Sequence, residues 1–143
     1  MIGHPPLLGP VIALVLWTGV IWCWMYATRI PAIMKARMRL DPMAPRGQQM
    51  SELPAQVRWK ADNYNHLLEI PTLFYAVALS LAMLGDGSSI SVALAWAFVG
   101  LRVVHSLHQC LSNQIPIRFA LFFLSSLLLF GLAVRAATMI FFP

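Results

Sequence analysis

An apolar segment without a single charged residue, running from Leu7 to Ala27, constrains this chain more than any other feature. As a helix its 21 residues would be about 31 Å long, which matches the hydrocarbon core of a bilayer. A cleaved signal peptide is the competing interpretation. However, no Lys or Arg precedes the segment, and it is longer than the apolar part of a signal peptide. We therefore expect it to remain in the protein and to span a membrane.

Three further apolar runs follow, and each is interrupted by only a few polar residues. They cover Leu67 to Leu84, Ile90 to Leu111 and Ile115 to Phe142. Composition agrees, because 59% of the residues are hydrophobic and 10% are charged, whereas soluble domains carry about 25% charged residues. We predict an all-α integral membrane protein, a single four-helix bundle over residues 1–143, with helices at about 7–34, 54–84, 89–111 and 116–142.

The basic residues gather around the first connection between the predicted helices, whereas the second connection carries only Asp86. The cluster consists of Lys35, Arg37, Arg39, Arg46, Arg58 and Lys60. Positively charged connections stay in the cytoplasm, so we expect the first and third connections there and both termini outside, in a bacterial inner membrane. We attribute the net charge of +5 to this orientation signal and expect no nucleic-acid partner.

The two cysteines, Cys23 and Cys110, both lie inside apolar runs. Such positions do not form the disulfide framework of a secreted protein. No Cys, His or Asp falls at a convincing ligand spacing beside His66 or His108, so we expect no metal site.

Polar residues at membrane depth form two helical stripes. Arg58, Asp62, Asn65 and Glu69 fall at offsets 0, 4, 7 and 11, and Arg102, His105 and Gln109 fall at offsets 0, 3 and 7. An unpaired Arg near the middle of a span costs at least about 2.5 kcal/mol. Glu69 is the only carboxylate within an apolar run, so we predict that it pairs with Arg102.

Two interpretations of these polar stripes stay open on physical grounds. Polar residues between helices can simply lock a bundle together. Alternatively, they hold an anionic polar ligand, because the cationic groups of Arg58, Arg102, Arg118 and His105 outnumber the nearby acids.

Three segments of the chain resemble the MAPEG family, the membrane-associated proteins in eicosanoid and glutathione metabolism. They are NHLLEIPTLFYAVAL (Asn65 to Leu79), WAFVGLRVVHSL (Trp96 to Leu107) and QIPIRF (Gln114 to Phe119). The resemblance runs from about Pro54 to the C-terminus, and more loosely through the first predicted helix. It implies a homotrimer of four-helix subunits that binds glutathione between adjacent subunits near the cytoplasmic side.

The same resemblance implies roles for individual residues. Arg118 is similar to an arginine beside the glutathione sulfur and is the expected catalytic residue, because a fixed cation favours the thiolate over the thiol. The expected glutathione-binding residues are Arg58, Asn65, Glu69, Arg102, His105 and Gln109. The chain departs from the family's pattern in the spacing of Asn65 and Glu69, and in having Gln109 and Phe122 where better-known enzymes have tyrosines.

Two functions follow from the resemblance. The first is a glutathione-dependent transferase or peroxidase that uses glutathione as cosubstrate and attacks a hydrophobic electrophile reaching the site from membrane lipid. The alternative is a non-catalytic membrane subunit or lipid-binding protein that uses the polar residues for trimer assembly or for attachment to a larger membrane complex.

Overall fold

A computed structural model describes residues 4–142 of the chain, and every regular element in this range is a helix. The elements are α1 (Leu8–Lys35), α2 (Gln48–Ser51), α3 (Ala55–Leu67), α4 (Ile70–Met83), α5 (Ser89–Leu111) and α6 (Ile115–Phe141). Four stretches are long and apolar enough to cross a membrane, namely α1, α3 together with α4, α5, and α6. The predicted all-α membrane protein with four spans is therefore confirmed.

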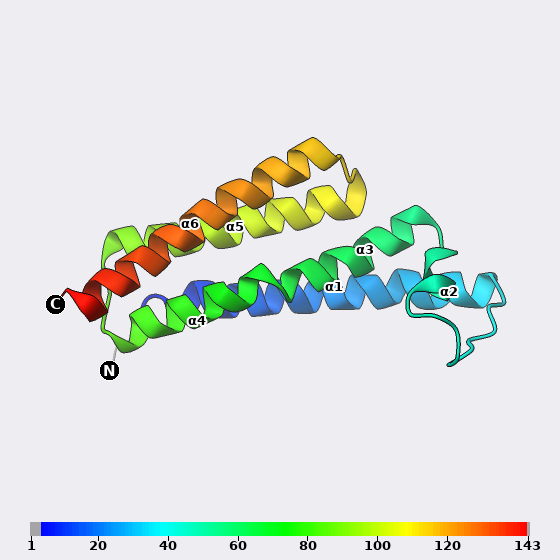
Figure 1. The fold of residues 1–143 in the computed structure, drawn as a ribbon, viewed down its shortest axis with the longest axis horizontal. Helices are drawn as coiled ribbons and strands as arrows, with labels where there is room; N and C mark the ends of the chain where they lie inside the picture. Colours follow the sequence, from blue (N-terminus) through cyan, green and yellow to red (C-terminus); the bar gives the residue numbers. More distant parts are fainter. Residues whose placement is uncertain (1–3, 143) are drawn as a thin grey trace.

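The spans form two hairpins that lie side by side (Figure 1). One hairpin pairs α1 with α3 and α4, and the other pairs α5 with α6, which share the most extensive interface. The α4–α5 connection lies at the same end of the bundle as both chain ends, whereas the α1–α3 and α5–α6 connections lie at the opposite end. The structure thus groups the connections as expected, and the side of the membrane that each end faces stays a prediction from the charges.

The span predicted over residues 54–84 is present at Ala55–Met83, but it is not one continuous helix. It divides into α3 and α4, with Leu68 and Glu69 between them and Glu69 at φ −93° and ψ −99°. The cause is Pro71, which has no N–H for the carbonyl of Leu67 and whose ring collides with that carbonyl in a regular helix. In the first turn of a new helix the same proline is tolerated.

The first connection contains the four-residue helix α2, which hydropathy does not predict. It begins after Gly47, whose φ of 84° lies in the left-handed region that glycine adopts without a steric cost. α2 therefore depends on a glycine-specific turn.

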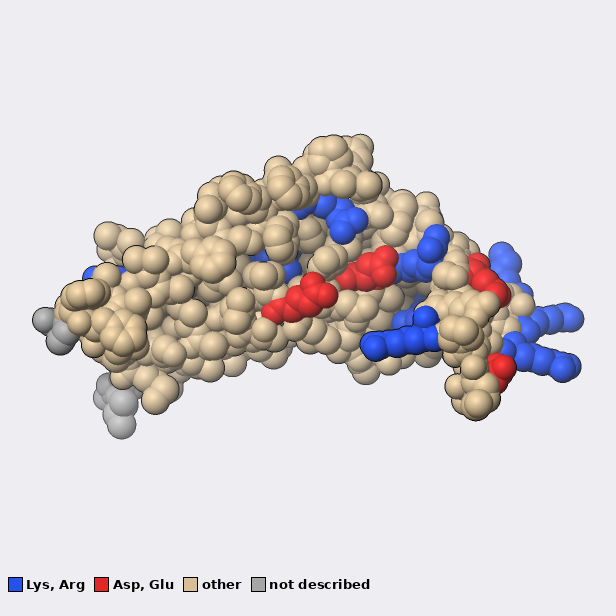
Figure 2. All heavy atoms as spheres, in the orientation of Figure 1, with Lys and Arg blue, Asp and Glu red and all other residues tan. Residues whose placement is uncertain are grey.

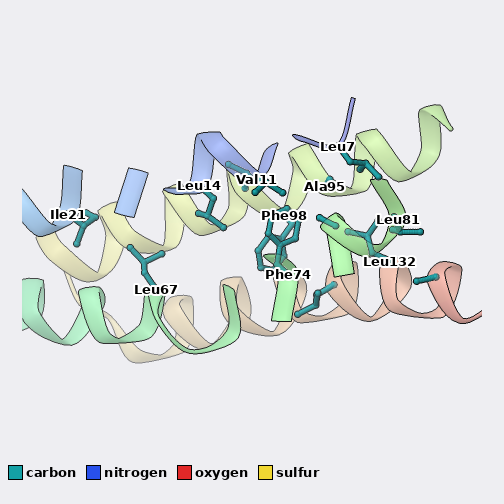
Figure 3. Packing of buried hydrophobic residues seen from close by; sticks show 14 of the residues in the cluster. Leu7, Val11, Leu14, Ile21, Leu67, Phe74, Leu81, Ala95, Phe98 and Leu132 are labelled. Atoms are coloured by element: carbon teal, nitrogen blue, oxygen red, sulfur yellow. The ribbon is translucent and has the colours of Figure 1, made fainter. Parts of the chain in front are cut away.

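Buried aliphatic and aromatic side chains from both hairpins interlock along the middle of the bundle (Figure 3). Phe74 of α4 stacks on Phe98 of α5 with ring centroids 4.4 Å apart. Because lipid tails are as apolar as leucine, close packing rather than removal from water favours this contact. The outward faces carry exposed apolar residues such as Leu16 and Phe130, as a lipid-facing surface requires.

Asp86 joins the two hairpins at the end that carries the chain termini. Its carboxylate accepts hydrogen bonds from the Ser88 backbone N–H at 3.0 Å, the Ser91 hydroxyl at 2.6 Å and Arg135 Nε of α6 at 3.3 Å. Burial alone would raise the pKa of this carboxyl, but the hydrogen bonds outweigh it and lower the pKa to about 2. Asp86 is thus charged at neutral pH, and its charge stabilises the fold.

We predict that Asp86→Asn lowers the free energy of unfolding by about 1–3 kcal/mol at pH 7, because it loses charge-assisted hydrogen bonds. Since folding lowers the pKa of Asp86, its contribution is fully present above the ordinary value of 3.8 and is lost as the pH falls toward 2. Thermal unfolding in detergent, followed by circular dichroism across this pH range, measures both effects.

Asp41→Asn is the matched control, because Asp41 also accepts a backbone hydrogen bond, from Met43 at 2.9 Å, but is exposed. Equal unfolding temperatures for the two variants would contradict the stabilising role of Asp86.

Candidate functional site

Arg102 places a guanidinium in the interior of the bundle, halfway along α5, with 1% of the residue exposed. Its Nη2 donates a hydrogen bond to the backbone carbonyl of His66 at 2.9 Å. That carbonyl lies in the last turn of α3, just before the helix break, where its other donor is the Glu69 N–H at a long 3.4 Å. The break caused by Pro71 therefore supplies an acceptor for the buried cation.

The predicted ion pair between Glu69 and Arg102 is wrong. Within residues 4–142 Asp86 pairs with Arg135, and Glu69 lies beside His66 rather than Arg102. Glu69 Oε2 lies 3.1 Å from His66 Nδ1, and 62% of the Glu69 side chain is exposed on the single chain. The physical reason is again the break, because Glu69 leaves the helical path and its side chain turns outward instead of toward α5.

Arg102 retains unused hydrogen-bonding capacity. Its Nε and Nη1 are buried and find no partner among the residues that the structure describes. His105, one turn further along α5, is also buried and has an unpartnered Nδ1. The imidazole of His105 lies within electrostatic reach of Arg102 and Arg118. Glu69 lies within electrostatic reach of Arg102, but no carboxylate of residues 4–142 lies within salt-bridge distance of it. The interior of the bundle thus holds unpaired donors and a positive charge that is not directly paired.

Gln109 lies on the buried polar face of α5, as its spacing from Arg102 predicts. Its hydrogen-bond partner is a residue that neither polar stripe of the sequence includes. Asn63 of α3, fully buried, donates from Nδ2 to Gln109 Oε1 at 3.0 Å. A signal was present, because Lys60, Asn63 and Leu67 at offsets 0, 3 and 7 form the buried face of α3. We refer to Asn63, Arg102, His105 and Gln109 as the buried polar cluster.

Arg118, the predicted catalytic residue, lies in the first turns of α6 and is half-buried. Its Nη1 donates to Asn113 Oδ1 at 2.6 Å, and its Nε has no partner within the described part of the chain. Asn113 adopts a φ of 54° in the short α5–α6 connection, a conformation that asparagine tolerates better than most residues. The connection therefore holds one end of the guanidinium and leaves the other free.

Arg58 and Asn65 lie apart from the buried polar cluster. They line a pocket of about 550 Å³ between α1, α3 and the first connection, and neither Arg118 nor the α5 residues of the cluster line it. Residues 4–142 contain no group of His, Cys, Asp or Glu side chains that could hold a metal ion. The predicted site residues therefore fall into a buried group on α5, Arg118, the exposed Glu69, and this separate pocket.

We predict that Asn63→Leu lowers the free energy of unfolding by about 1–2 kcal/mol, because it leaves the buried Gln109 carbonyl without its donor. The double variant Asn63→Leu/Gln109→Leu should regain most of the loss, since both polar partners are then absent. Chemical unfolding of the purified variants in detergent measures these values. Asn65→Leu, an exposed position on the same helix, should change stability by less than about 0.5 kcal/mol. A double variant no more stable than Asn63→Leu would contradict the pairing.

Comparison with known proteins agrees with the architecture. No curated protein and no solved structure matches the chain. A family model does match, over residues 7–138, and it is the model of the MAPEG family. This match covers the first three spans, most of the fourth and every residue of the buried polar cluster, so the chain belongs to the MAPEG family.

Proposed function

We propose that this protein is an integral membrane glutathione-dependent transferase or peroxidase that acts on a hydrophobic electrophile. The observation that carries the proposal is the Arg102 guanidinium, buried at membrane depth with two unpartnered nitrogens and no carboxylate bonded to it among the described residues. A buried cation without compensation is costly, and an anionic ligand would remove that cost.

Glutathione fits this requirement chemically. It carries two carboxylates for guanidinium groups, an ammonium for a carboxylate such as Glu69, and a thiol whose anion needs a cation nearby. Membership of the MAPEG family supports this choice, because the enzymes of that family bind glutathione. The participation of Arg58 and Asn65 stays a prediction, since both line the separate pocket.

In the proposed reaction Arg118 stabilises the glutathione thiolate with its free Nε. For a transferase, the sulfur forms a bond to an electrophilic carbon and the leaving group departs with the bonding electrons. For a peroxidase, the sulfur attacks a hydroperoxide oxygen and the O–O bond breaks to release an alcohol. A second glutathione then reduces the sulfenic acid, giving the disulfide and water. Gln109 is engaged with Asn63, and Phe122 offers no hydroxyl, so the thiolate depends mainly on Arg118.

We further propose that three copies assemble in the membrane. Glu69 lies near the middle of the second span, and its side chain is 62% exposed on the single chain. A carboxylate facing hydrocarbon is costly, whereas a neighbouring subunit covering it removes the cost. The family resemblance supports the number three and the placement of glutathione between adjacent subunits.

Native mass spectrometry of the protein released from nanodiscs tests the assembly. We expect the mass of three chains, with added glutathione increasing that mass by one to three tripeptides. A species containing a single chain at every protein concentration would contradict the proposed trimer.

We predict that Arg118→Ala lowers the rate of conjugation to 1-chloro-2,4-dinitrobenzene by about 10²-fold, because it removes the charge that stabilises the thiolate. Glutathione affinity, measured by calorimetry, should change less than the rate. Arg102→Leu should instead abolish binding, because it removes the buried cation.

Arg39→Ala, in the exposed first connection, is the control and should behave as wild type. If the wild-type protein binds no glutathione, the proposal fails and the non-catalytic alternative takes its place. The hydrogen bond between Asn63 and Gln109 favours that alternative, because these two members of the buried polar cluster already bond to each other and hold α3 against α5.

A further inference from the structure

The pocket lined by Arg58 and Asn65 has features that the proposed glutathione chemistry does not use. It lies where α1 and α3 meet the first connection, and its volume is about 550 Å³. Its walls include the apolar side chains of Met25, Met50, Leu53 and Val57. The pocket thus lies at the boundary between the apolar spans and the basic connection.

Three guanidinium groups line this pocket, each from a different element of the fold. Arg29 belongs to the end of α1, Arg46 to the first connection and Arg58 to α3. Asp62 is the only carboxylate in the lining, so positive charge remains after it is neutralised. In Figure 2 the Lys and Arg side chains gather at this end of the molecule. Guanidinium groups bind phosphate oxygens through paired hydrogen bonds, which makes a phosphate the matching ligand.

The connection that carries Arg46 is ordered by hydrogen bonds on both sides of this residue. Gln49 of α2 accepts a hydrogen bond from the Asp41 N–H at 3.2 Å and donates one to the Arg39 carbonyl at 2.8 Å. The Ser51 N–H bonds to the Gly47 carbonyl at 2.9 Å and closes the turn beside Arg46. The backbone beside Arg46 is therefore ordered by its own hydrogen bonds, which reduces the entropy cost of binding a ligand.

An apolar track formed by two exposed aromatic residues, Trp22 and Tyr26, leads from the pocket along α1. Tyr26, which lines the pocket, meets Trp22 edge to face with ring centroids 5.0 Å apart. Both residues are exposed on the chain, at 42% and 47%. A ligand with an anionic head and hydrocarbon tails can place its head among the arginines and its tails over these two rings. Free glutathione has no tails to occupy the track.

We propose that this arginine pocket binds the phosphate group of an anionic phospholipid, with the acyl chains lying along Tyr26 and Trp22 of α1. The site is distinct from the buried polar cluster, whose Arg102, His105 and Gln109 do not line it. It is an alternative to the predicted role of Arg58 and Asn65 in glutathione binding, and it is independent of the roles proposed for Arg102 and Arg118.

The test uses the full chain in detergent, titrated with dioleoyl phosphatidylglycerol and, separately, dioleoyl phosphatidylcholine, with native mass spectrometry to count bound lipids. We expect one phosphatidylglycerol per chain at concentrations where phosphatidylcholine does not bind. Arg46→Gln should weaken phosphatidylglycerol binding by about tenfold, which corresponds to about 1.4 kcal/mol for a lost charge-assisted contact. Arg39→Gln removes an equal charge from the same connection without touching the pocket lining, and should weaken binding less than about twofold.

Two competitors separate the possible sources of the anion. Inorganic phosphate should displace the lipid only at far higher concentration, because it cannot occupy the apolar track, and glutathione should not displace it. Equal losses for Arg46→Gln and Arg39→Gln would overturn the proposal in favour of diffuse surface attraction. Displacement by glutathione would overturn it in favour of a tripeptide site, and tight binding of phosphate alone would show that the lipid tails contribute nothing.

Discussion

The hydrogen bond from Arg102 to the carbonyl of His66 connects the main features of this bundle. A guanidinium inside a membrane protein needs acceptors, and regular helices have already used their carbonyls. Here Pro71 interrupts the second span beside the Arg102 side chain of α5. The break leaves the His66 carbonyl able to accept the hydrogen bond that the guanidinium requires. An interrupted helix and a buried guanidinium each destabilise a membrane protein on their own. In this contact each supplies the hydrogen-bonding partner that the other lacks. The same break turns Glu69 outward, which leaves Arg102 with spare donors and exposes an acid on the chain's surface.

The sequence predicted the spans well because hydropathy is a property of whole segments, and all four spans fall within about one residue of their expected bounds. It also predicted that Arg102, His105 and Gln109 would share a buried face, since α5 is uninterrupted and its 3.6-residue period holds throughout. The same reasoning failed for Glu69, because a helical wheel assumes continuity across Leu68. Asn63 was overlooked for a different reason. Polarity alone does not reveal which of two polar faces of a helix is turned inward, and the partner of Asn63 lies 46 residues away.

Positive charge occupies two environments in this protein, and they favour different ligands. In the buried polar cluster the low dielectric strengthens electrostatic interactions, so the single charge of Arg102 is enough to favour binding of an anion. In the arginine pocket the groups are more exposed and solvent screens them, so several guanidinium groups must converge before a site gains selectivity. MAPEG membership over residues 7–138 supports a ligand for the first environment, whereas the shape and apolar margin of the second support a lipid.

The Asp86 hydrogen bonds tie the α4–α5 connection to α6 at one end of the bundle. At the opposite end the two hairpins are joined by no chain connection, since α1–α3 and α5–α6 each close within their own hairpin. There the hairpins are held together by side chains instead, since Asn63 donates to Gln109 and Lys60 Nζ donates to the carbonyl of Cys110, both between α3 and α5. Separation of the hairpins at the end that carries Arg118 would therefore require breaking side-chain hydrogen bonds but would not stretch the chain itself.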